Sequence, residues 1–364
     1  MAATPRVATT VSARGAQPIL RVRTWALADY WMLTKPRVNL LIVVATGAGF
    51  YLGWPTYAHA FPVMRLVHTV LGTLLLASGA ATLNQVLERR FDAQMRRTAR
   101  RPLAAGRLHP AAALRFGVVL TLGGAVYLAA AVNTLASVLG IFTAASYLGV
   151  YTPLKRKTPL CTLLGAFSGA MPPLIGWAGA SGRLGAEAWT LYAILFAWQF
   201  PHFMAIAWMY REDYQRAGYL VLPAGAGRER FVVWQSLLPA VALIPLSLTP
   251  TFLGAAGRAY LVGAFVLSAG FVWFAAQLAV RRSNASARRL LLASISYLPT
   301  LLVLLVIGKT APAIEASPRG LGVHERAPIL GRVADTAAPA LSRAPYASSF
   351  EHLEPGMLDA SWSP

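Results

Sequence analysis

The sequence predicts an all-α, polytopic membrane protein with nine transmembrane helices. Three observations indicate this class: the composition, a series of long apolar runs, and a regular alternation of strongly and weakly basic connections. Of the 364 residues, 56% are hydrophobic and only 13% are charged, whereas a soluble domain carries about 25% charged residues. Most of the surface is therefore expected to face lipid, and the bilayer is the first expected partner of the chain.

Each predicted helix is an apolar run of the length that crosses a hydrocarbon core, which takes about 17–25 residues. The first run is short by itself and is expected to begin near Trp31. Glycine and proline interrupt several runs, as membrane-spanning helices tolerate. The runs lie at residues 38–52, 66–87, 111–132, 135–151, 160–180, 188–209, 231–253, 259–280 and 290–307.

Basic residues gather in every second connection between these runs. The basic connections contain Lys35 and Arg37; Arg89, Arg90, Arg96, Arg97, Arg100, Arg101 and Arg107; Lys155, Arg156 and Lys157; Arg211, Arg216, Arg228 and Arg230; and Arg281, Arg282, Arg288 and Arg289. The alternate connections contain only Arg65, Arg183 and Arg258. Because lysine and arginine concentrate in cytoplasmic loops, we expect the N-terminus inside and the C-terminus outside. The net charge of +20 then indicates loops at an anionic leaflet or a site for an anionic substrate, and no nucleic-acid partner is expected.

The two ends of the chain differ in composition from the apolar middle. Residues 1–30 are predicted to be a basic, flexible arm, residues 31–309 the transmembrane domain, and residues 310–364 a disordered tail. The first 28 residues contain no acid, as in a mitochondrial transit peptide. Because the arm is short, we expect a bacterial inner membrane rather than the mitochondrial inner membrane. The single cysteine, Cys161, excludes a disulfide within the chain.

An amide and two carboxylates stand near the end of the second run. Asn84, Glu88 and Asp92 are four residues apart, so in a helix successive members turn by only about 40° and form one polar stripe. Such oxygen ligands suit Mg²⁺, which binds through one or two carboxylates plus substrate phosphates. The same spacing also fits a solvated carboxylate pair neutralised by neighbouring arginines.

Basic side chains surround this stripe in the sequence. Arg96, Arg97 and Arg101 follow it directly, and a metal beside several guanidinium groups suits a diphosphate. A second polar cluster, with Arg211, Glu212 and Asp213, follows four crossings later and must face the same compartment. Two further basic connections lie on the same membrane face, and they contain Lys35, Arg37 and Asn39, and Lys155 and Lys157.

These segments resemble the UbiA-type intramembrane prenyltransferases, in particular the branch that acts on haem. The resemblance rests on residues 84–103, 151–177 and 198–223, with the Thr-Lys-Pro-Arg-Val segment at 34–38. It implies a bundle of nine helices around a central cavity, in which Glu88 and Asp92, helped by Asn84, hold Mg²⁺ on farnesyl diphosphate. It also implies that Arg96, Arg97, Arg101, Lys155 and Lys157 stabilise the leaving diphosphate, and that a vinyl group of haem b is the acceptor. The implied role is haem O formation for haem-copper oxidases, with haem A synthase or oxidase assembly factors as protein partners.

Under this resemblance, His202 has two alternative roles. It could ligate the haem iron or bind a propionate, since neutral imidazole is a common metal ligand. Because it follows Pro201 in a spanning run, it could instead be a structural donor to carbonyl groups that the proline leaves free.

The second cluster departs from the wider family pattern. Tyr210 and Tyr214 stand where the superfamily has aspartates, which makes a second complete Mg²⁺ site doubtful. A prenyltransferase acting on a quinone or chlorophyll precursor is one alternative. A transporter of an anionic substrate is another, but its polar groups would lie at the midplane rather than at one membrane face.

Overall fold

The computed structural model describes residues 20–55, 60–223, 225 and 227–310. Within these residues the chain is helical, apart from its loops and a single isolated bridge between Ala256 and Lys309. The helices are α1 (Leu20–Leu33), α2 (Pro36–Gly53), α3 (Val63–Asp92), α4 (Pro110–Ala131), α5 (Thr134–Ala145), the π-helical turn η1 (Ser146–Tyr151), α6 (Thr152–Leu154), α7 (Cys161–Gly169), α8 (Pro172–Ser181), α9 (Ala186–Met209), α10 (Arg211–Arg216), α11 (Gly227–Phe252), α12 (Arg258–Arg281) and α13 (Asn284–Ile307).

In this described part of the chain, nine helical segments are long and apolar enough to cross a membrane. They are α2, α3, α4, α5 through α6, α7 with α8, α9, α11, α12 and α13. The all-α fold and the number of spans predicted from the apolar runs are therefore confirmed.

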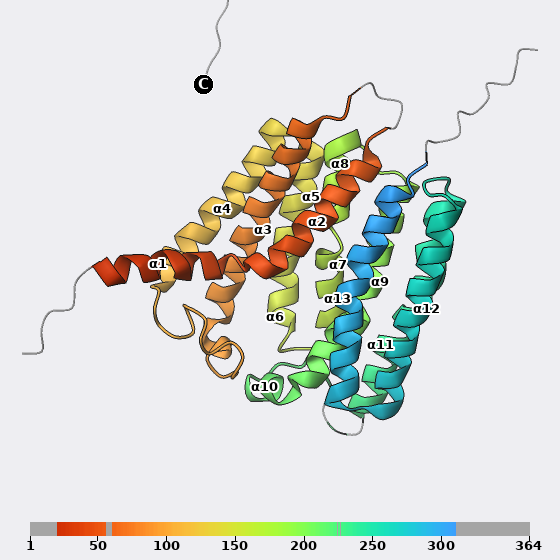
Figure 1. The fold of residues 1–364 in the computed structure, drawn as a ribbon. Coiled ribbons are helices and arrows are strands. Elements are labelled where there is room, and N and C mark those ends of the chain that lie inside the picture. The colour runs from red at the N-terminus through yellow and green to blue at the C-terminus, as the bar shows by residue number, and fades with distance from the viewer. Residues whose placement is uncertain (1–19, 56–59, 224, 226, 311–364) are drawn as a thin grey trace, which may run out of the picture. The chain divides into compact units, whose positions relative to one another are not determined.

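The first span differs from the expectation at its start. Lys35 has φ 51°, a left-handed conformation that ends α1, and α2 begins at Pro36. Proline disfavours the α conformation in the residue before it, so the chain breaks here and α1 runs at an angle to α2 (Figure 1). Residues 20–30, which we assigned to a flexible arm, are thus helical. The rest of the predicted arm and the predicted tail beyond Thr310 lie outside the described residues.

Helices from distant parts of the chain lie side by side in the bundle. The second helix packs against α3 and α8, while α9 packs against α11 and α13, and α13 also reaches α2. The contact between α2 and α8 is very close: a Cβ atom at Gly176 would lie 2.0 Å from the Thr46 carbonyl oxygen. Small residues at helix contacts are the usual means of close packing in a membrane.

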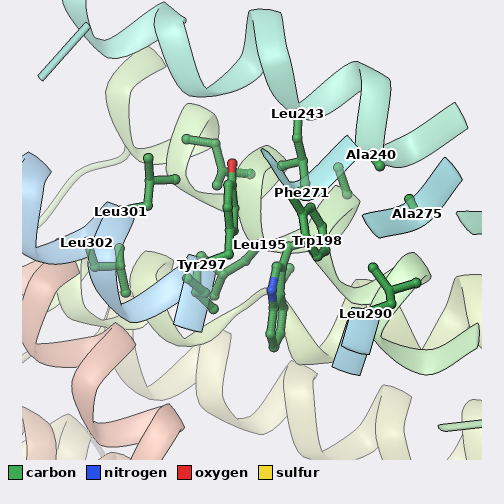
Figure 2. Close-up of a cluster of buried hydrophobic side chains, with 14 of the residues drawn as sticks. Leu195, Trp198, Ala240, Leu243, Phe271, Ala275, Leu290, Tyr297, Leu301 and Leu302 are labelled. Atoms are coloured by element: carbon green, nitrogen blue, oxygen red, sulfur yellow. The ribbon is translucent and has the colours of Figure 1, made fainter. Parts of the chain in front are cut away.

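The largest cluster of buried apolar side chains joins α9 to the last three spans. Figure 2 shows Leu195 and Trp198 of α9 beside Leu243 of α11, Phe271 of α12 and Tyr297 of α13. The rings of Phe271 and Tyr297 are stacked, with centroids 4.9 Å apart. This packing fixes α9, and therefore fixes the end of α9 that leads into α10.

Candidate active site at the basic end of the helices

The polar stripe of α3 is buried rather than solvated. Asn84, Glu88 and Asp92 have exposed fractions of 1%, 5% and 2%. Water therefore does little to neutralise the two carboxylates, and the protein must provide their counter-charges.

Three cationic side chains from three different segments reach this stripe. Lys35 Nζ donates to Asn84 Oδ1 at 3.0 Å, and Lys155 Nζ forms an ion pair with Glu88 Oε1 at 2.6 Å. Arg101 pairs with Asp92 Oδ2 at 2.7 Å. The helix break before Pro36, the end of α6 and the loop after α3 thus converge on one face of α3.

Neutral side chains hold the same groups in place. Asn84 donates to Thr152 Oγ1 at 3.0 Å, and the Thr98 hydroxyl donates to the Asp92 carbonyl at 2.8 Å.

Asn39 donates to Ser78 Oγ at 2.8 Å and to the Thr34 carbonyl at 2.7 Å. Asn39 therefore fixes the turn that presents Lys35 to α3.

Burial and neighbouring charges set the protonation of the two lysines. Burial, together with the positive charge of Arg101, lowers the pKa of Lys35 to about 7. Burial also opposes the charged form of Lys155, but the Glu88 carboxylate outweighs this effect and raises the pKa of Lys155. The Lys155 ammonium also lies 4.5 Å from the centre of the Tyr151 ring, a favourable cation–π contact. Lys155 is therefore the fixed cation of the site, whereas Lys35 changes protonation readily.

The second polar cluster is joined to the loop that follows α3. Asp213 of α10 accepts a hydrogen bond from the Arg97 backbone N–H at 3.2 Å and pairs with Arg216. The Arg97 guanidinium lies 5.2 Å from the centre of the Tyr210 ring. The two clusters, which the sequence predicts on one membrane face, are thus in direct contact.

The remaining predicted residues lie farther from the stripe or face outward. Arg211 donates to the Trp208 carbonyl and to Asn284. The side chains of four others are exposed and form no hydrogen bond or ion pair with described residues: Arg37, Arg96, Lys157 and Glu212.

His202 contacts α13 instead of α3. Its Nδ1 lies 2.7 Å from Ser294 Oγ, and its ring stacks on Trp198 with centroids 4.7 Å apart. The Ser294 hydroxyl already donates to the Leu291 carbonyl, and a hydroxyl has one proton. Nδ1–H is therefore the donor, and Nε2 keeps its lone pair.

No sequence pattern predicts four of the residues that lie at this site: Ser78, Thr98, Thr152 and Tyr219. Ser78 and Thr152 contact Asn39 and Asn84 from segments distant in the sequence, so no local pattern marks their place in the site. The Tyr219 ring centre lies 5.9 Å from the Lys155 ammonium. Tyr219 follows Gly218, whose φ of 67° forms a tight turn next to the second polar cluster, and a glycine at that place in the sequence is the one signal for it.

The oxygen atoms of the polar stripe suit a metal ion that takes its remaining ligands from a bound substrate. No group of three His, Cys, Asp or Glu side chains that could hold an ion occurs among the residues described. Two carboxylates and an amide on one helix face are too few for a closed protein site. They match Mg²⁺, which commonly takes its other ligands from phosphates and water.

Fold and site together define a polytopic helical membrane protein with a buried cluster of charged side chains at one end of the bundle. Residues 40–298 match the model of the UbiA prenyltransferase family. The chain is 47% identical to a protoheme IX farnesyltransferase of Solibacter usitatus, over 78% of this chain and 99% of the relative. It is 42% identical to one of Koribacter versatilis, over 78% and 94%. The chain belongs to the UbiA prenyltransferase family.

Solved structures show the same fold. A digeranylgeranylglyceryl phosphate synthase aligns with a TM-score of 0.63 and 16% identity, over 78% of this chain and 98% of that chain. A UbiA homologue from Archaeoglobus fulgidus bound to GPP and Mg²⁺ aligns with a TM-score of 0.55 and 15% identity, over 77% and 99%. At this identity the likeness concerns the fold alone.

Proposed function

We propose that this protein transfers the farnesyl group of farnesyl diphosphate to a vinyl group of haem b, with Mg²⁺ as cofactor. The observation that carries the proposal is the burial of Glu88 and Asp92 between cationic groups of three separate segments. The named relatives, at up to 47% identity among those compared, support haem as the acceptor and a bacterial membrane as the location. The basic connections support a cytoplasmic site, with the N-terminus inside and the C-terminus outside.

Two kinds of group would bind the diphosphate. Glu88 and Asp92, with Asn84 beside them, would hold Mg²⁺, which neutralises phosphate oxygens and stabilises the developing negative charge. Lys35, Arg97, Arg101 and Lys155 would donate to the diphosphate, and bidentate guanidinium contacts add orientation to charge. The proposed substrate-binding set would also include Arg37, Asn39, Arg96, Lys157, Arg211, Glu212 and Asp213.

The basic groups would act mainly when the allylic C–O bond breaks. The electron pair of that bond moves to the diphosphate oxygen, so negative charge grows next to Lys155 and Arg101. Fixed cations that face growing charge stabilise the transition state more than the bound substrate. The vinyl π electrons of haem would then form the new C–C bond with the allylic cation. The carbocation left beside the porphyrin would add water, which releases one proton to the solvent and gives the hydroxyethylfarnesyl substituent.

His202 would bind the acceptor. Because Nδ1–H donates to Ser294, the lone pair of Nε2 is available for the haem iron.

The test is an assay of the purified protein with haem b, farnesyl diphosphate and Mg²⁺, with mass spectrometry of the product. Asp92→Asn should abolish transfer while membrane insertion stays intact. Asp29→Asn is the matched control, because Asp29 is equally buried and pairs with Arg107 away from the stripe; it should lower stability but retain transfer. Normal turnover by Asp92→Asn would refute the Mg²⁺ assignment. Transfer to a quinone precursor but not to haem would refute the acceptor.

A further inference from the structure

Tyr219 has a buried phenol group that makes no hydrogen bond of good geometry with any described residue. The residue is only 5% exposed, and its hydroxyl contacts no donor or acceptor of the described residues in hydrogen-bonding geometry. A buried hydroxyl without a partner destabilises a folded protein. Such a group therefore needs an explanation, and a missing ligand is one.

The surroundings hold this phenol in one place. The Tyr219 backbone N–H donates to the Tyr214 carbonyl at 2.9 Å, and the next N–H, of Leu220, donates to the Lys155 carbonyl at 2.7 Å. The ring packs in a small cluster with Met95 and Ala217, with the Phe91 ring centroid at 6.0 Å. A tyrosine fixed on both sides of its backbone cannot easily turn its hydroxyl toward water.

The same surroundings place the phenol beside the polar stripe. The Lys155 ammonium lies 5.9 Å from the centre of the Tyr219 ring. The Glu88 carboxylate is a near neighbour of the phenol, although the two are not in hydrogen-bonding geometry, and an ordinary phenol is protonated at neutral pH. The phenol thus stays protonated and is a donor near both carboxylates, each of which is already paired with a cation.

We propose that the Tyr219 phenol donates a hydrogen bond to the diphosphate of the bound prenyl diphosphate, and that this bond strengthens as the allylic C–O bond breaks. The inference rests on the proposed function, because it concerns the same site. No proton is transferred: the electron pair goes to the diphosphate oxygen, and the phenol O–H only stabilises the charge that this oxygen gains. A fixed neutral donor of this kind acts mainly on the transition state.

The test is Tyr219→Phe, which removes only the hydroxyl. We expect kcat to fall by about 100-fold, with KM for farnesyl diphosphate changed by less than about threefold because most of the effect is on the transition state. The melting temperature of the ligand-free variant should be equal to or above that of the wild type, since an unpaired buried hydroxyl is removed. The rise in melting temperature caused by inorganic pyrophosphate with Mg²⁺ should become smaller.

Tyr260→Phe is the control. Its buried hydroxyl has a partner, because it donates to the Ser247 carbonyl at 2.7 Å, so this variant should melt at a lower temperature and keep wild-type kinetics. If Tyr219→Phe does not fold, Tyr219→Met also removes the donor and replaces the ring by an apolar chain that can pack beside Met95.

Two results would overturn the proposal. One is an unchanged kcat together with an unchanged pyrophosphate effect. The other is a lower ligand-free melting temperature with a higher Mg²⁺ requirement, which would mean that the phenol supports Glu88. The pyrophosphate measurement needs no acceptor, so it tests Tyr219 even if the wild-type protein fails to prenylate haem.

Discussion

Lys155 neutralises the buried Glu88 carboxylate, a task that a bound metal ion could also perform. Removing one partner of a buried ion pair costs about 3–5 kcal/mol, because the other charge stays buried without compensation. We therefore expect Lys155→Gln to lower the melting temperature of the ligand-free protein. Mg²⁺ should raise the melting temperature of this variant more than that of the wild type, since the freed carboxylate can then bind the ion. The measurement is thermal unfolding in nanodiscs with and without Mg²⁺.

Arg107→Gln serves as the control for Lys155→Gln. It breaks the ion pair with Asp29, whose carboxylate lies 2.8 Å from the guanidinium. Asp29 does not belong to the polar stripe. This variant should also melt at a lower temperature, but Mg²⁺ should restore nothing. An equal Mg²⁺ effect in both variants would show that Glu88 is not a metal ligand.

At the scale of helices, the contact between α2 and α8 depends on the absence of side chains. A Cβ atom at Gly176 would lie 2.0 Å from the Thr46 carbonyl oxygen, whereas one at Gly47 would meet nothing within 4 Å. Gly176→Ala should therefore destabilise the protein by about 1–3 kcal/mol through overpacking. Gly47→Ala should be neutral or stabilising, because alanine favours a helix by up to about 1 kcal/mol. Equal melting temperatures for the two variants would contradict this close contact.

The hydrogen bond between His202 and Ser294 joins α9 to α13 and allows the two roles of the histidine to be separated. His202→Ala and Ser294→Ala should each lower the melting temperature, and the double variant should lower it by less than the sum, since both remove one bond. Haem affinity, followed by the Soret absorption, should fall strongly only in His202→Ala. An equal loss of affinity in both single variants would limit His202 to a structural role.

The elements that the sequence predicted well are those that local composition determines. Long apolar runs gave the nine spans, because lipid contact requires the same residues along the whole length of a helix. The break at Lys35 was missed although Pro36 marks it, since the apolar run continues across the break. Asn84, Glu88 and Asp92 were visible as a stripe because one helix carries all three. Thr152 and Tyr219 were not, because their positions depend on contacts between segments far apart in the chain.

At the scale of the whole molecule, the orientation in the membrane remains a prediction from the basic connections. Labelling of single cysteines can test it, in a Cys161→Ala background because Cys161 is the one native cysteine. Gln94 and Arg258 are both exposed and lie at opposite ends of the described spans. We expect a membrane-impermeant maleimide to label Arg258→Cys in intact cells, and Gln94→Cys only after permeabilisation.

The same pair of cysteines checks both the span count and the compartment of the site. Five of the described spans, α4 through α11, separate Gln94 from Arg258, and an odd number of crossings must place the two positions on opposite sides. Labelling of both from one side would contradict the span count. Reversed labelling would keep the count but place Glu88 and Asp92 on the outer face, where a diphosphate made in the cytoplasm would not reach them. Labelling as expected, together with retained prenyl transfer by both cysteine variants, would establish that the buried carboxylates open to the side that supplies the substrate.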